Sequence, residues 1–178
     1  SPASLRSMGK TANIAGGAHD YEAQIEIMRD HGLQIWAAFT LGHDHDTRES
    51  IEETVDFAMR HKFPFAAFNI LMPYPSTPLY RDLAGEGRLL YDGRWWLHPD
   101  YRFNHAAFVP RHLSPEELTE LCFAARSRFN APVSIVRRSF DRKTNMQSLF
   151  RLALYLRGSA LFRKEVFKKH GMRLGSGS

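Results

Sequence analysis

The sequence predicts an α/β fold in which helices alternate with short, buried strands of a parallel sheet. Helical patterns over 20–31 and 46–62 alternate with nearly continuous apolar runs over 33–41 and 65–72. The repeat of about 30 residues is typical of βαβ units, so the sheet is expected to be open or curled into a barrel. Two strands cannot form such a sheet alone, and further strands are expected upstream.

The first half of the chain supplies clear boundaries for these elements. Gly32 is expected to end the helix over 20–31, because glycine commonly follows the last turn of a helix. The run over 33–41 is too short for a typical helix, which predicts a strand buried on both faces. The helix over 46–62 is expected to begin with Asp46 as its cap.

The region after the second strand changes character. The apolar run over 65–72 leads into the proline-rich segment 73–78, which predicts a stiff loop because proline fixes φ. A short helix is expected over 78–84, followed by an aromatic, turn-rich stretch over 85–110.

The last part of the sequence predicts helices. Ser114 is a strong cap for a helix that is expected to end near Asn130. Two further helices are predicted over 145–157 and 159–170, broken at Gly158.

Charge and cysteine content limit the class of protein. The net charge of +5 is unevenly spread, because residues 137–173 hold 11 Lys and Arg against two acids, or +9, and residues 1–136 carry −4. The one cysteine, Cys122, cannot form an internal disulfide, so a reducing cytoplasm is the expected compartment. Ser1 and the Gly/Ser residues 175–178 indicate artificial ends, with 175–178 a linker scar and the chain a piece of a longer protein.

The residues that could carry chemistry are few. The polar cluster His43, Asp44, His45 and Asp46 directly follows a predicted strand, where ligands bind in parallel sheets. A metal site is one interpretation, and a polar loop that caps the next helix is the favoured one, since adjacent ligands rarely converge on one ion. Cys122 lies among apolar residues and is interpreted as a core residue rather than a nucleophile.

Four segments, in order, resemble the second half of the radical SAM barrel, in its cobalamin-binding subgroup. They are 5–10 (LRSMGK), 38–47 (AFTLGHDHDT), 69–80 (NILMPYPSTPLY) and 113–118 (LSPEEL). The resemblance covers about residues 1–140, and 69–80 is its most specific part.

The resemblance implies a fold and a division of the chain. The fold would be the last βα units of a partial TIM-like (βα)6 barrel, followed by a helical C-terminal extension. Residues 1–84 would belong to the barrel, 85–130 to an aromatic connection and closing helix, and 131–174 to the basic extension.

The resemblance also implies binding of S-adenosylmethionine (SAM). The residues that match the family's positions around the adenine, the methionyl carboxylate and the substrate cavity are Lys10, Ala38, Thr40, Gly42, Asp46, Leu71, Pro73 and Tyr74. Lys10 matches the basic position that pairs with the methionyl carboxylate, a role that suits a point charge.

The cofactors of the family cannot all be held by this chain. The [4Fe–4S] cluster is held by three cysteines of a CxxxCxxC segment, and this sequence has one cysteine. The chain alone is therefore expected to be inactive. Its parent would cleave SAM reductively to a 5′-deoxyadenosyl radical, with cobalamin-dependent methylation or C–H functionalisation as the reaction.

The basic end predicts a partner with negative charge. Residues 145–173 combine apolar faces with cations, which indicates peripheral contact with the inner membrane near a lipophilic small-molecule substrate such as a polyprenoid or porphyrin. A helical pair packed on the barrel with a solvated basic face is the favoured alternative. A non-enzymatic module that binds anionic lipid or RNA is the competing class, with no motif for nucleic acid.

Overall fold

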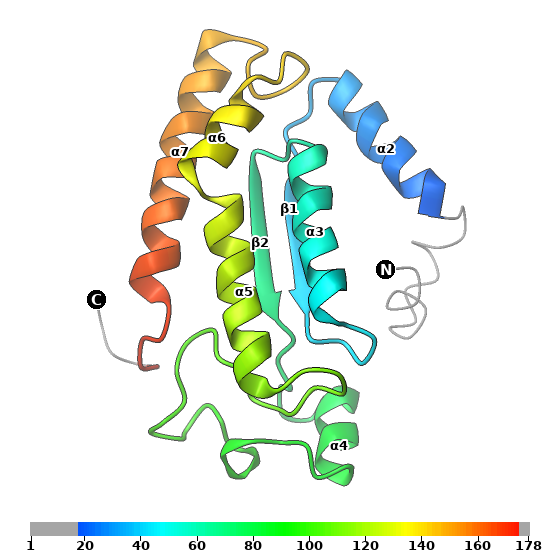
Figure 1. The fold of residues 1–178 in the computed structure, drawn as a ribbon, viewed down its shortest axis with the longest axis vertical. Helices are drawn as coiled ribbons and strands as arrows, with labels where there is room; N and C mark the ends of the chain where they lie inside the picture. Colours follow the sequence, from blue (N-terminus) through cyan, green and yellow to red (C-terminus); the bar gives the residue numbers. More distant parts are fainter. Residues whose placement is uncertain (1–17, 175–178) are drawn as a thin grey trace.

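The structure is a computed structural model that describes residues 18–174, with side chains from residue 22 onward. It is a mixed α/β arrangement with few strands and several helices (Figure 1). In chain order the elements are α2 (Ala18–Asp30), β1 (Trp36–Leu41), α3 (Arg48–Arg60), β2 (Phe65–Ile70), α4 (Pro78–Gly85), η2 (Tyr91–Gly93), α5 (Pro115–Phe129), α6 (Pro132–Ser139) and α7 (Leu149–Lys169).

The two strands pair in parallel, as the alternation of helices and strands predicts. The register runs from Trp36 opposite Phe65 to Leu41 opposite Ile70. Alternate side chains of both strands, among them Leu41 and Phe68, lie in the main core, to which α3 and α5 also contribute. Figure 1 shows both helices covering one face of the sheet.

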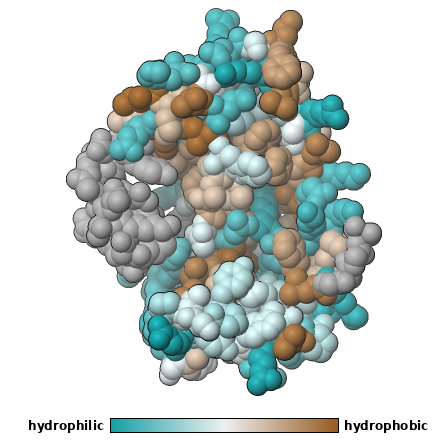
Figure 2. Space-filling view, turned by 180° about the vertical axis from the view of Figure 1, so that it is seen from behind, coloured by the Kyte–Doolittle hydropathy of each residue, from teal (hydrophilic) through white to brown (hydrophobic). Residues whose placement is uncertain are grey.

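The other face of the sheet is largely uncovered, so the prediction of a strand buried on both faces is wrong for β1. Trp36 is 62% exposed, and Ala38 and Thr40 are exposed as well. Among the described residues, only the beginning of this face is covered, where Phe162 of α7 lies 5.3 Å from the Trp36 ring and 5.0 Å from the Phe65 ring. Figure 2 shows the molecule from this side, with weakly polar and apolar surface in the middle of the view.

The helix ends follow local capping rules with one correction. Gly32 ends α2 with a φ of +74°, as predicted. The cap of α3 is Thr47, whose hydroxyl accepts from the Ser50 amide, and not Asp46. The Asp46 carboxylate instead accepts hydrogen bonds from the amides of Gly42 and His43, which directly follow β1. Because both residue types can accept at a helix start, the choice depends on the turn that precedes it.

The middle helices confirm the predicted boundaries. Ser114 caps α5 in a capping box with Glu117, and Asn130 ends it. The short helix α4 begins at Pro78 with Thr77 as its cap. Helix α6 was not predicted, although Pro132 at its first turn is a common start signal.

The last helix differs from the prediction of two helices. Helix α7 is continuous over 21 residues and passes through Gly158. A Cβ at this glycine would lie 2.5 Å from Cζ of Phe65, so Gly158 allows the helix to approach the sheet closely. Its cap is Ser148, whereas Asn145 is buried in the preceding loop.

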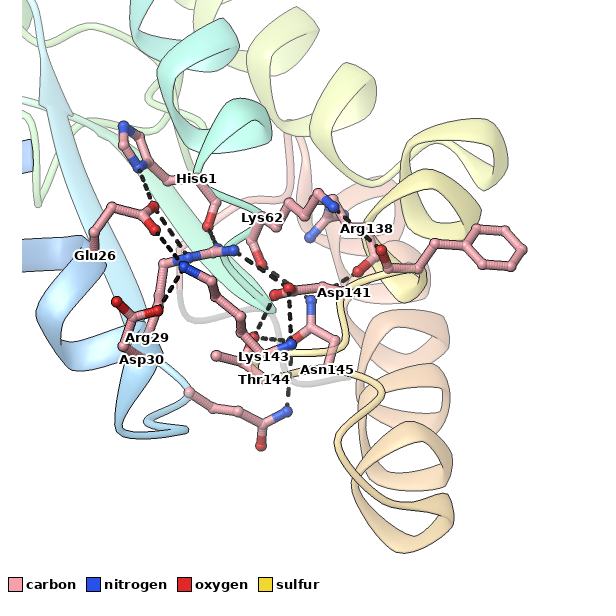
Figure 3. Close-up of polar contacts among 12 residues, drawn as sticks. Glu26, Arg29, Asp30, His61, Lys62, Arg138, Asp141, Lys143, Thr144 and Asn145 are labelled. Carbon is pink, nitrogen blue, oxygen red and sulfur yellow. Dashed lines mark hydrogen bonds and ion pairs between the residues drawn. The ribbon is translucent and has the colours of Figure 1, made fainter.

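A polar network joins α2, the α3–β2 loop and the α6–α7 loop at the amino ends of the strands (Figure 3). Arg29 lies 3.3 Å from Asp141 and donates to the His61 carbonyl. Asn145 donates to the carbonyls of Lys62 at 3.0 Å and Arg138 at 2.9 Å. These contacts fix the end of the sheet that lies away from the loops described next.

Within the described part of the chain, no helix is both long and apolar enough to cross a bilayer.

Candidate functional site

The candidate site lies where the two parallel strands end. Leu41 and Ile70 are the last residues of β1 and β2, and the Leu71 amide still donates to the Leu41 carbonyl at 2.8 Å. The loops that follow, 42–47 and 71–77, therefore leave the sheet at the same edge. In parallel sheets this edge is where ligands bind.

The loop after β1 depends on Gly42 and Asp46. Gly42 has a φ of +100°, and a Cβ there would lie 2.7 Å from Leu118 and 3.2 Å from Phe108. The Asp46 carboxylate accepts from the amides of Gly42 at 2.8 Å and His43 at 3.0 Å. The loop is thus held in one conformation by a glycine that only just fits and by a carboxylate bonded to backbone.

Asp44, in the same loop, is part of an ion-pair cluster. It lies 3.0 Å from Arg88 and 2.9 Å from Arg111, and both arginines also pair with Glu86 at 2.8 Å. Desolvation raises the pKa of Asp44, but hydrogen bonds from Arg111 and Arg88 outweigh it, so this pKa lies below its ordinary value. The cluster fixes the β1 loop to the segments that follow α4 and precede α5.

The metal interpretation of residues 43–46 gains no support. Asp44 and Asp46 direct their carboxylates to arginines and backbone amides. Among the side chains that the structure describes, residues 22–174, no three or more of His, Cys, Asp or Glu gather as a metal site. The favoured interpretation, a polar loop, describes these two residues better.

The proline-rich loop after β2 is anchored by aromatic side chains. The Pro73 carbonyl accepts from Trp95 Nε1 at 3.0 Å, and the Tyr74 ring lies 5.8 Å from the Trp95 ring. Tyr74 is nevertheless 58% exposed. Thr77 closes the loop by accepting from the Tyr80 amide and donating to the Tyr74 carbonyl.

The stretch over 85–110 forms a second, smaller core beneath this loop. Trp95, Tyr101 and Ala107 are buried together, and Met72 packs against them. Burial raises the pKa of Tyr101 to about 12. The predicted aromatic connection therefore stabilises the loop that follows β2.

The uncovered face of the sheet carries small and polar side chains toward its carboxyl end. Ala38 lies opposite Ala67, and Thr40 lies opposite Asn69. Thr40 and Asn69 are both exposed, and Asn69 Oδ1 accepts from Arg126 at 3.2 Å. Asn69 is not among the site residues that the sequence predicts, although alternation along β2 puts it on the same face as Ala67.

The structure brings together most of the residues that the sequence predicts for the site. Ala38 and Thr40 share the uncovered face, and Gly42 and Asp46 form the loop at its end. Leu71 is half-buried, Pro73 is buried and Tyr74 is exposed in the second loop. Lys10 lies outside the described residues.

Cys122 is a core residue, as predicted. It is 0% exposed, and burial raises the pKa of its thiol to about 11. Its Sγ lies 3.5 Å from the Phe68 carbonyl. A thiol in this setting is not a ready metal ligand or nucleophile.

Several enzymes are similar to this chain. Bacteriochlorophyllide d C-12(1)-methyltransferase of Chlorobaculum tepidum is 32% identical over 119 residues, which are 67% of this chain and 24% of the relative. Hopanoid C-2 methylase of Rhodopseudomonas palustris is 28% identical over 108 residues, 61% of this chain and 20% of the relative. Anaerobic magnesium-protoporphyrin IX monomethyl ester cyclase of Cereibacter sphaeroides is 27% identical over 96 residues, which are 54% of this chain and 15% of the relative.

These relatives are cobalamin-type (B12-type) radical SAM enzymes, and the chain belongs to this family, which confirms the resemblance. The chain spans 24% or less of the length of these three curated relatives. No protein-family profile matches the chain. No solved structure matches it either.

Proposed function

We propose that this chain is the C-terminal part of the catalytic barrel of a radical SAM enzyme, and that it contributes one wall of the SAM site. Strands β1 and β2 would be the fifth and sixth strands of a partial (βα)6 barrel. Their uncovered face would line the barrel interior, and α3 and α5 would be outer helices.

The observation that carries this proposal is the uncovered face at the carboxyl end of the sheet. Ala38 and Ala67 form a flat floor without long side chains, and Thr40 and Asn69 lie beside it with hydrogen-bonding groups. Such a surface fits a planar adenine, because it offers apolar contact and polar partners at the rim. The family resemblance assigns Ala38, Thr40, Gly42 and Asp46 to the adenine, which supports the proposal.

The two edges of the sheet differ in a way that favours a partial barrel. Further strands would pair with the free edge of β1 and not with the outer edge of β2. The outer edge of β2 is occupied at Phe68, whose carbonyl accepts from Arg126 Nε at 2.6 Å. Among the described residues, β2 is the only strand paired with β1, so the other edge of β1 has no strand beside it. A sixth strand that ends the sheet is what a partial barrel requires.

Individual residues would have distinct roles around SAM. Thr40 would hydrogen-bond the ligand directly, and Asn69, positioned by Arg126, would do the same from the neighbouring strand. Gly42 and Asp46 would hold the loop shape rather than contact charge, because the Asp46 carboxylate already accepts from two amides. Pro73 and Tyr74 would border the adenine or the substrate cavity, and Lys10 would pair with the methionyl carboxylate.

The residues present do not fit an iron–sulfur cluster. Cys122 is buried in the core with a raised pKa, and no other cysteine exists in the sequence. The cluster and cobalamin would be held by other parts of the parent protein. The cluster would supply the one-electron reduction that cleaves SAM, and this chain would contribute residues that position SAM.

We further propose a lipophilic small molecule as the substrate, with methylation or a related C–H functionalisation as the reaction. The relatives' names specify bacteriochlorophyllide and a hopanoid as substrates of methylation. Tyr74, in the loop after β2, is 58% exposed and lies 5.8 Å from the Trp95 ring. An exposed aromatic side chain suits contact with a flat, apolar molecule.

The test uses the full-length parent protein, with its cluster reconstituted under anaerobic conditions. With SAM and a one-electron reductant, it should produce 5′-deoxyadenosine above a cluster-free control. The Asn69→Ala and Thr40→Val variants should keep their iron content and raise the Kd for SAM about tenfold, the effect of one lost hydrogen bond. Glu52→Gln, on the exposed side of α3, is the matched control and should leave the Kd unchanged.

Two outcomes would overturn the proposal. One is a loaded, reduced enzyme that binds no SAM in equilibrium dialysis. The other is an Asn69→Ala and Thr40→Val double variant with unchanged SAM affinity, since the uncovered face would then not be the SAM wall. Membrane contact is a separate proposal, because it depends on α7 and not on this site.

A further inference from the structure

We propose that the outward stripe of α7 docks on the surface of an anionic membrane, with the helix lying in the plane of the interface. The stripe consists of Phe150, Leu154, Arg157, Leu161, Lys164 and Lys168. It goes beyond the SAM site, which lies on the sheet, and it can be tested without cofactors.

The spacing of these residues puts them on one side of the helix. Successive members are four or three residues apart, which keeps them in register with the helical turn. The opposite side of α7 is buried, with Tyr155 and Ser159 both 0% exposed. Helix α7 has 21 residues, so the helix is about 30 Å long.

The stripe exposes large apolar side chains to solvent, which a folded domain usually buries. Phe150 is 76% exposed, Leu154 is 50% exposed and Leu161 is 58% exposed. Figure 2 shows hydrophobic surface interspersed with hydrophilic surface on the side of the molecule formed by α7. Exposed apolar side chains that recur along one side of a helix favour an interaction site.

The charge of the stripe favours an anionic partner. Arg157, Lys164 and Lys168 form no ion pair with a carboxylate of the described residues. The one acid of α7, Glu165, instead pairs with Lys169 at 2.6 Å. A second copy of this chain would bring the same cations against each other, so self-association through the stripe is disfavoured by electrostatics.

A bilayer interface can accommodate both the apolar and the cationic residues of the stripe. Leucine and phenylalanine side chains enter the boundary between headgroups and acyl chains, and lysine and arginine extend their charges to the phosphates. Near an anionic surface each cation strengthens binding about fivefold. Helix α7 is not apolar enough to span a membrane, which is consistent with a helix that lies on the surface.

The test measures flotation of the 178-residue chain with vesicles. Vesicles of equal parts phosphatidylcholine and phosphatidylglycerol should bind the protein at low salt, and phosphatidylcholine vesicles should bind it far more weakly. Arg157→Gln/Lys164→Gln/Lys168→Gln should lower the partition coefficient on the order of a hundredfold. Phe150→Glu/Leu161→Glu should lower it at least tenfold, and circular dichroism should show unchanged folding for both.

A matched control removes the same charge elsewhere. Arg60→Gln/Arg81→Gln/Arg137→Gln neutralises three exposed cations on α3, α4 and α6 and should lower binding by less than tenfold. Equal loss in this control would overturn the proposal, because binding would then follow net charge alone. Three other results would also overturn the proposal. They are no flotation at low salt, dimers that the Phe150→Glu/Leu161→Glu variant dissociates, and an RNA oligonucleotide that binds more tightly than the vesicles.

Discussion

The two ends of the sheet use polar residues in opposite ways. At the amino ends of the strands, Arg138 is 2% exposed and donates to the carbonyls of Phe63 at 2.7 Å, Pro64 at 3.1 Å and Phe129 at 2.7 Å. At the carboxyl ends, Asp44 and Arg111 are 45% and 48% exposed, and the Arg88 side chain is 14% exposed.

This difference separates the residues that stabilise the fold from those that can bind a ligand. A buried charge is tolerated only when its hydrogen bonds are made inside the protein, so the groups at the amino end have little capacity left for a ligand. The carboxyl end keeps Thr40, Asn69 and Tyr74 exposed. We therefore expect substitutions to reduce stability mainly at the amino end and to reduce ligand affinity mainly at the carboxyl end.

The largest expected loss of stability is at Arg138. Arg138→Met leaves three carbonyls without their donor, so the free energy of unfolding should fall by about 3–5 kcal/mol. Urea titration measures this loss. Arg137→Met, on the exposed side of the same helix, should change it by less than about 0.5 kcal/mol. An Arg138→Met variant with an unchanged free energy of unfolding would contradict the comparison between the two ends of the sheet.

Gly42 is the expected exception at the carboxyl end. Gly42→Ala should lower the free energy of unfolding by about 2–4 kcal/mol, because the methyl group meets Leu118 and the backbone has a positive φ. Gly87→Ala separates the two causes: its φ is +68° with nothing within 4 Å of the added Cβ, so it should cost about 1–2 kcal/mol. Equal losses from thermal unfolding would show that the contact with Leu118 does not matter.

One substitution made at both ends sharpens the comparison further. The Tyr155 hydroxyl is buried and donates to the Ile135 carbonyl at 2.7 Å, so Tyr155→Phe should cost about 1–2 kcal/mol. Tyr74 is 58% exposed, so Tyr74→Phe should leave stability unchanged. Calorimetry of both variants checks this, and a larger loss for Tyr74→Phe would reverse the assignment.

The smallest expected effect is the pH dependence contributed by Asp44. Its pKa is lowered in the folded state because hydrogen bonds from Arg111 and Arg88 outweigh desolvation. It therefore stabilises the fold above the unfolded pKa of about 3.9. The contribution is lost as pH falls through the lower, folded value. Since its side chain is 45% exposed, the contribution should not exceed about 1 kcal/mol.

Asp44→Asn should accordingly lower the free energy of unfolding at neutral pH and leave it unchanged in strong acid. Stability curves of both proteins should converge below about pH 3. Curves that stay parallel through this range would show that the ion-pair cluster contributes no pH-dependent stability.

Local patterns predicted much of the fold. The alternation of helices and strands, the stop at Gly32 and the cap at Ser114 each depend on a few neighbouring residues, and all are present. The segments over 38–47 and 69–80 indicate the family without any tertiary information, and the relatives confirm it. The assignment of SAM-binding roles and the division at residues 84 and 130 stay predictions.

Other features depend on contacts far apart in the sequence. The helix continues through Gly158 because Phe65 occupies the space that a side chain would fill. Asn69 belongs to the uncovered face because β2 pairs with β1 in one particular register. No pattern near Arg138 indicates that its partner is the carbonyl of Phe63, 75 residues away.

The sequence by itself determined the alternation of helices and strands up to β2, where α5 begins, and the family, because capping and hydrophobic periodicity act over a few residues and motifs can be compared directly. Only the tertiary structure decided which sheet face is uncovered, which cations are buried and which side of α7 points outward. These depend on how elements pack, and packing balances burial against desolvation across the whole molecule.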